Sequence, residues 1–123
     1  MQRVEELSVD NMVSRSGRDV PNQFILRTAV GTYFKSYTSI IVLETEDGRI
    51  FLDVNKWDYS RTTGRYRNIF LAETKKETEA KIKAGVYKLV DLNAGVLPEE
   101  VTDPSYTKPT NDGVRLIRFR KEG

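Results

Sequence analysis

The chain has 123 residues, 38% hydrophobic and 31% charged, which fits one folded domain and excludes a disordered chain. Its 20 Lys and Arg against 18 Asp and Glu leave a net charge of only +2. Cysteine and histidine are absent, which excludes disulfides, thiolate nucleophiles, imidazole bases and metal sites built on Cys or His. No apolar run approaches the ~18–20 residues of a membrane helix, so we expect no membrane partner.

Residues 1–21 predict an N-terminal arm with little structure. The apolar residues between Val4 and Met12 have a spacing that could form a short helix, which the Ser-Arg-Ser-Gly run at 14–17 would end. Pro21 disfavours helix in the residue before it. We therefore place a boundary at this proline.

Residues 22–92 predict the core domain, which starts with strands. Alternating apolar residues on both sides of Gly31 predict a hairpin over 23–36. An Asp-Gly turn between two runs rich in β-branched residues predicts a second hairpin over 39–54. Short consecutive strands joined by tight turns favour an antiparallel sheet.

Two short helices are expected next in the chain. Ser60 and Thr62 are both good N-caps for a helix over 62–72. Thr74 and Glu77 have the spacing of a capping box, in which each side chain bonds a backbone N–H of the other residue. The second helix is therefore predicted over 75–84.

Residues 93–123 predict an irregular connection followed by a C-terminal strand at 114–120, after an earlier strand at 86–92. The expected fold class is α+β, with an antiparallel sheet of about five or six strands packed against the two helices. The residues expected in the core are Phe24, Leu26, Ile41, Leu43, Phe51, Leu52, Trp57, Ile69, Phe70, Ile82 and Leu89.

Five short signatures occur together in this chain. They are Asn-Gln-Phe at 22–24, Gly-Thr-Tyr-Phe-Lys-Ser-Tyr at 31–37, Trp-Asp-Tyr-Ser-Arg-Thr-Thr at 57–63, Phe-Leu at 70–71, and Lys-Glu-Thr…Lys-Ile…Gly…Tyr at 76–87. In combination they resemble a small uncharacterised domain of tailed-bacteriophage proteins, over residues 22–92. The resemblance implies a phage origin and action in the bacterial host cytoplasm, and it brings no site residues with it.

Positive charge gathers in residues 61–92, which hold eight basic and four acidic side chains. Arg and Tyr often anchor protein interfaces, and Arg also binds phosphates through two parallel hydrogen bonds. The candidate binding residues are Trp57, Tyr59, Arg61, Arg65, Tyr66, Arg67, Lys75, Lys81, Lys83 and Arg118. The alternative is structural, with the aromatic residues in the core and the cations in water.

With neither imidazole nor thiol available, we expect a protein that is not an enzyme and has no cofactor or metal. The first hypothesis is a bacteriophage accessory protein that binds a bacterial host protein and inhibits or redirects it, anchored by Tyr59, Arg65, Tyr66 and Arg118. The alternative is a nucleic-acid-binding module, for single strands or duplex, that uses the cationic cluster at 59–83. Capture of a nucleotide by the same cluster, and pairing with a second copy of the chain, remain open.

Overall fold

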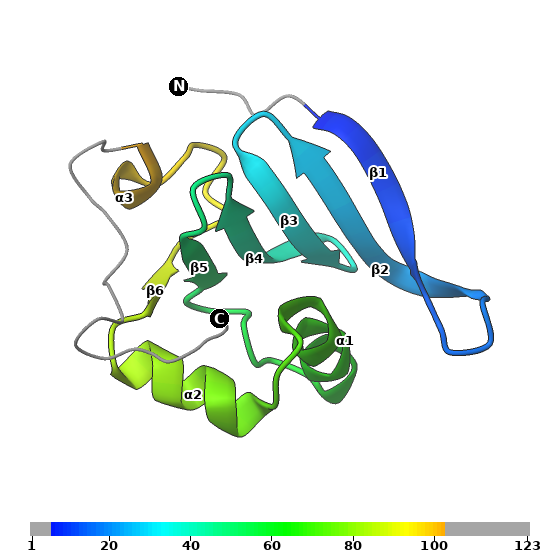
Figure 1. The fold of residues 1–123 in the computed structure, drawn as a ribbon. Coiled ribbons are helices and arrows are strands. Elements are labelled where there is room, and N and C mark those ends of the chain that lie inside the picture. Colours follow the sequence, from blue (N-terminus) through cyan, green and yellow to red (C-terminus); the bar gives the residue numbers. More distant parts are fainter. Residues whose placement is uncertain (1–5, 103–123) are drawn as a thin grey trace.

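The computed structural model describes residues 6–102, so the expected strand at 114–120 and Arg118 lie outside the described part. One sheet contains all six described strands, in chain order (Figure 1). They are β1 (Glu6–Val13), β2 (Asp19–Thr28), β3 (Gly31–Ser36), β4 (Ser39–Thr45), β5 (Ile50–Asp53) and β6 (Tyr87–Val90). The α+β class is confirmed.

The sheet is mixed, and not antiparallel throughout as predicted. Strands β1 to β5 pair antiparallel, whereas β6 runs parallel to β5. The reason is the connection: α1 (Arg61–Leu71) and α2 (Lys75–Lys83) lie between β5 and β6 and return the chain to the same end of the sheet. The short helix α3 (Glu99–Thr102) follows β6.

The strand alternation divides the core into two layers, one on each face of the sheet. The face under α1 and α2 contains Phe34, Val42 and Leu52, which are fully buried. The opposite face contains Leu43 and packs against Val101 of α3. Figure 1 shows α1 and α2 on one side of the sheet and α3 apart from them.

The predicted core is largely confirmed. The buried members are Leu26, Ile41, Leu43, Phe51 and Leu52, and those half-buried against the two layers are Phe24, Trp57, Phe70, Ile82 and Leu89. The prediction that Ile69 lies in the core is wrong, because this residue is 56% exposed. It follows Arg65 by four residues and therefore shares the outer face of α1 with it.

Residues 6–13 form an edge strand, so the prediction of an arm with little structure is wrong for them, and the short helix considered there is absent. In β1, Val9 pairs with Leu26 and Asp10 pairs with Ile25. Met12 enters the core layer beneath the helices. The spacing of the apolar residues is compatible with either structure, and pairing with β2 decides between them because it satisfies the backbone of both segments.

The predicted capping box opens α2. The Thr74 hydroxyl accepts from the Glu77 N–H at 3.1 Å, and the Glu77 carboxylate accepts from the Thr74 N–H at 2.8 Å.

We expect Thr74→Ala to lower the free energy of unfolding by about 1 kcal/mol, measured by urea denaturation. Thr62→Ala is the control, since that exposed hydroxyl caps nothing, and its effect should stay within about 0.5 kcal/mol. Equal effects of the two substitutions would contradict the role of the box.

Candidate functional site

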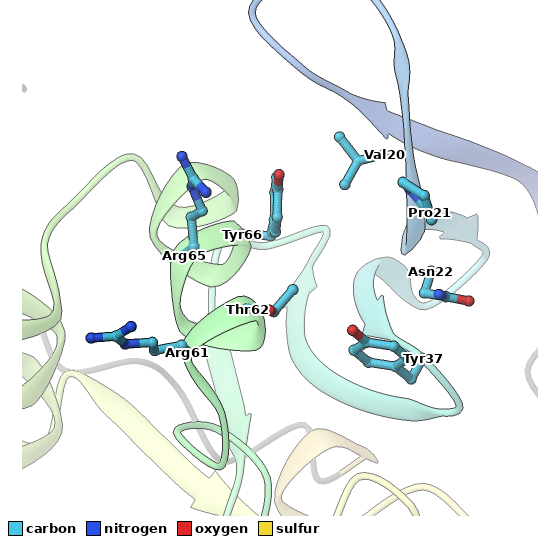
Figure 2. Close-up of a pocket in the computed structure, with 8 residues that line it drawn as sticks. All are labelled: Val20, Pro21, Asn22, Tyr37, Arg61, Thr62, Arg65 and Tyr66. Atoms are coloured by element: carbon cyan, nitrogen blue, oxygen red, sulfur yellow. The ribbon is translucent and has the colours of Figure 1, made fainter.

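A groove of about 600 Å³ opens between α1 and the N-terminal half of β2 (Figure 2). We call it the α1–β2 groove. Its lining residues come from three parts of the chain: Val20, Pro21 and Asn22 from β2, Tyr37 from the connection between β3 and β4, and Arg61, Thr62, Arg65 and Tyr66 from α1.

The β2 wall is an irregular part of its strand. The ladder between β1 and β2 shifts register between Asn11 and Val13, opposite residues 20–23 of β2. Pro21 has no N–H to give to a ladder, and prolines within sheets concentrate at such irregularities. Asn22 adopts a left-handed backbone with φ of 67°. The irregular segment bends β2 and forms one side of the groove.

Tyr37 faces this wall from a backbone conformation that is unfavourable for tyrosine. Its φ is 58°, in the left-handed region, where residues with a side chain are disfavoured by roughly 1–2 kcal/mol. The Tyr37 N–H donates to the Asn22 carbonyl at 2.7 Å, which holds the two residues together. Within residues 6–102, three non-glycine residues have positive φ, and two of them line this groove.

The first turn of α1 is fixed to the sheet. Of the two N-caps expected from the sequence, Ser60 caps the helix: its hydroxyl accepts from the Thr63 N–H at 3.1 Å. The Thr63 hydroxyl lies 2.9 Å from the Ser36 hydroxyl at the end of β3, and both side chains are fully buried. This contact holds α1 against β3.

Different sides of α1 present different chemistry at the groove. Figure 2 shows Thr62 pointing to the strand side, with Tyr66 standing beside it, whereas the guanidinium groups of Arg61 and Arg65 point away from Tyr37. The arginine side chains therefore border the groove, and their charges lie on its rim. The rest of the lining consists of two tyrosine side chains, aliphatic carbons, the Thr62 hydroxyl and the Asn22 amide.

Arg61 and Arg65 are exposed cations one helical turn apart. Among residues 6–102, neither has a carboxylate partner, and the first turn of α1 contains no acidic residue. The Arg65 guanidinium lies 6.0 Å from the centre of the Tyr66 ring. The rim is thus positively charged and open to a partner.

Arg67, predicted as a binding residue, is instead an internal residue with 1% of its surface exposed. Its guanidinium donates to the Trp57 carbonyl at 2.6 Å and to the Asn68 side chain at 2.8 Å, and it lies 5.2 Å from the Trp57 ring. Trp57 itself is half-buried. Both residues fix the segment before α1 and do not form an exposed surface.

The predicted lysines lie away from the groove. Lys75 pairs with Asp58 at 2.8 Å, and Lys81 pairs with the buried Glu73 at 2.7 Å. Lys83 is exposed near the end of α2. The structure therefore divides the cationic cluster into separate ion pairs and single charges.

Tyr59 is exposed, with the Lys56 ammonium 4.8 Å from its ring centre, and it does not line the groove. Of the predicted binding residues, the structure brings Arg61, Arg65 and Tyr66 together. The β2 wall was not predicted from the sequence, and Tyr37 was not among the predicted binding residues. A signal for the wall was present in the Pro-Asn pair at 21–22, because proline interrupts ladders and asparagine tolerates the left-handed region.

Asp58 makes stability depend on pH. Partial burial acts to raise the pKa of its carboxyl, but hydrogen bonds from Lys75 and Arg67 outweigh burial and lower the pKa below its ordinary value of 3.8. A lowered pKa stabilises the fold above the ordinary value, and the stabilisation is lost as pH falls through the folded-state pKa. We expect wild type to lose more stability than Asp58→Asn between about pH 5 and pH 3, by urea denaturation. Parallel losses would contradict the ion pairs.

The described residues contain no group of three or more acidic side chains that could hold a metal ion. Nor is any helix within residues 6–102 long and apolar enough to cross a membrane. What the groove offers is recognition: two rings, a threonine hydroxyl, an asparagine amide and two guanidinium groups.

Comparison with curated proteins and with solved structures gives no match. A family model does match, over residues 7–85. That range is more than half of the chain, and it includes both walls of the α1–β2 groove. The chain therefore belongs to DUF8033, a family of unknown function.

Proposed function

We propose that this chain is a non-enzymatic bacteriophage accessory protein that binds a bacterial host protein in the host cytoplasm and inhibits or redirects it. The phage origin and the location rest on the resemblance of the five sequence signatures. The observation that carries the binding function is the α1–β2 groove, where Tyr37 and Tyr66 meet Arg61 and Arg65. Tyr and Arg are enriched among the residues that dominate binding energy at protein interfaces.

The distribution of charge favours a protein partner over a nucleic acid. A nucleic-acid surface is typically a continuous basic face. In this chain Arg67 is buried, and Lys75 and Lys81 are neutralised by Asp58 and Glu73. Two arginines beside an aromatic groove suit a compact protein contact better than a long phosphate backbone.

The nucleic-acid alternative depends on the same groove. Tyr37 and Tyr66 could stack unpaired bases while Arg61 and Arg65 contact phosphates. This function predicts binding to a fluorescein-labelled single strand that weakens steeply as salt rises. Anisotropy at low salt with no binding at micromolar protein would exclude it.

The proposed function is tested by affinity capture. Tagged wild-type chain in bacterial lysate should retain a host protein in stoichiometric amount, and Tyr37→Gly should lose it, because the substitution removes one ring of the groove. Thr38→Gly is the matched control, since Thr38 is adjacent and exposed but does not line the groove. Absence of any stoichiometric protein, or equal capture by Tyr37→Gly, would contradict the proposal.

Tyr37→Gly also has an expected effect on stability. Glycine adopts the left-handed backbone without the steric penalty that tyrosine has at φ of 58°, although it loses more entropy on folding. We expect an unfolding free energy equal to wild type or higher by up to about 1 kcal/mol. Thr38→Gly, where φ is not positive, should instead cost about 0.5–1 kcal/mol. Thermal unfolding measures both, and a strong loss in Tyr37→Gly would show that the ring serves the fold.

A further inference from the structure

We infer that the α1–β2 groove binds an acidic segment of the partner protein, with one apolar or aromatic side chain inside the groove and Asp or Glu residues against Arg61 and Arg65. The inference rests on the proposed function, because it states what chemistry the partner presents. Three features of the described residues support it: the interior, the rim and the preformed backbone.

The interior suits a side chain with little polarity. Val20 and Pro21 supply aliphatic carbons on one wall, and the rings of Tyr37 and Tyr66 supply aromatic surface. A volume of about 600 Å³ lies within the range of roughly 300–1,000 Å³ that ligand pockets usually have. A leucine or an aromatic residue of a partner would bury its surface between these walls.

The rim determines the charge of the partner. Arg61 and Arg65 both line the groove, and their exposed guanidinium groups point away from Tyr37 in Figure 2, so the residues that flank the seated side chain, and not that side chain itself, would meet them. The carboxylates nearest in sequence, Asp58 and Glu73, are already paired with Lys75 and Lys81. Two cations without an acidic partner among the described residues favour a partner with Asp or Glu flanking its apolar residue.

The backbone of the groove is fixed before any partner arrives. The hydrogen bond from Tyr37 to Asn22 holds the strand side, and the Ser36–Thr63 contact holds α1 against β3. A preformed site loses less conformational entropy on binding. The left-handed conformation of Tyr37 is unfavourable for folding, which is consistent with a ring held in place for binding.

The contact extends along α1 beyond the groove. Arg61, Arg65 and Ile69 are spaced by four residues and share one exposed face of the helix. The exposed Ile69 adds an apolar surface next to the cationic rim. A segment lying along α1 would meet both, which fits an acidic segment with more than one apolar residue.

The test uses a displayed library of random peptides, selected on immobilised wild-type chain. We expect enriched peptides to combine Asp or Glu with an apolar or aromatic residue. A synthetic copy should bind the double variant Arg61→Glu/Arg65→Glu about tenfold or more weakly, whereas Lys76→Glu/Lys83→Glu should bind within about twofold of wild type. Lys76 and Lys83 are the control because they are exposed on α2, away from the groove. Circular dichroism checks that both variants fold.

Four results would overturn the inference. Enriched peptides without an excess of acidic residues would do so, as would acidic peptides that bind the Arg61→Glu/Arg65→Glu variant as tightly as wild type. A labelled oligothymidine that binds wild type and not this variant, with no acidic peptide enriched, would assign the groove to nucleic acid. If a host protein is captured from lysate but no acidic peptide binds, the inference fails while the proposed function stands. If acidic peptides bind the groove but no host protein is captured, the proposed function fails while the binding of acidic segments stands.

Discussion

Replacing Arg67 with Ala is expected to lower the free energy of unfolding by about 3–4 kcal/mol. The guanidinium is buried, and it satisfies the Trp57 carbonyl, the Asn68 side chain and one oxygen of Asp58. Alanine leaves these groups without their donor, and it also leaves space next to the Trp57 ring. Both effects act on the segment that leads into α1, so α1 and its side of the groove should loosen together.

Two companion variants separate the causes. Arg67→Met keeps most of the volume and removes the hydrogen bonds, so it should recover part of the loss. Arg65→Ala lies two residues away on the exposed face of the same helix and should change stability by less than about 0.5 kcal/mol. Urea denaturation measures all three. Equal small effects of Arg67→Ala and Arg65→Ala would mean that Arg67 is not the internal residue that the structure shows.

Glu73→Ala is expected to cost about 2–3 kcal/mol of unfolding free energy. The Glu73 side chain is 4% exposed and lies between α1 and α2. It accepts hydrogen bonds from the Thr78 and Tyr87 hydroxyls and from the Lys81 ammonium. These contacts connect α2 to β6, the strand that runs parallel to β5.

The Tyr87 hydroxyl depends most on this carboxylate. Burial, followed by the nearby charge of Glu73, raises the pKa of Tyr87 well above its ordinary value, so the phenol stays protonated and donates. Alanine at position 73 leaves that donor without its acceptor in a buried position. Glu73→Gln keeps an acceptor and loses the charge, so it should be less damaging.

The control for Glu73 is Glu79→Ala. Glu79 is exposed and pairs weakly with Lys75 at 4.0 Å, so its loss should change stability by less than about 0.5 kcal/mol. Guanidinium chloride unfolding of the three variants compares them under one condition. A Glu73→Ala protein as stable as Glu79→Ala would contradict the role of the buried cluster.

The sequence predicts the elements whose signals are local. The Asp-Gly turn, the Ser60 cap and the Thr74–Glu77 box each depend on a few adjacent residues, and the corresponding hairpin and helices are present. The strand β1 is different, because its apolar residues fit two structures and only pairing with β2 selects one. The parallel placement of β6 likewise depends on how two helices return the chain, which no local pattern contains.

The candidate site was less predictable than the fold. Arg61 and Arg67 have the same residue type and lie in the same helix, yet one lies on the groove rim and the other inside. Burial of an arginine depends on a carbonyl elsewhere in the chain, that of Trp57, which sequence spacing does not reveal. Tyr37 was not among the binding residues predicted from the sequence. Its position in the groove depends on a left-handed backbone conformation, which sequence patterns predict for glycine and not for tyrosine.

Amide hydrogen exchange tests most directly whether the α1–β2 groove is the contact surface. It compares the free chain with the chain bound to the host protein that it captures. Slower exchange on binding is predicted at residues 20–23, 37–38 and 61–66, with α2 unchanged. Protection confined to α2 or to the β1 edge, with the groove exchanging as in the free chain, would contradict the account.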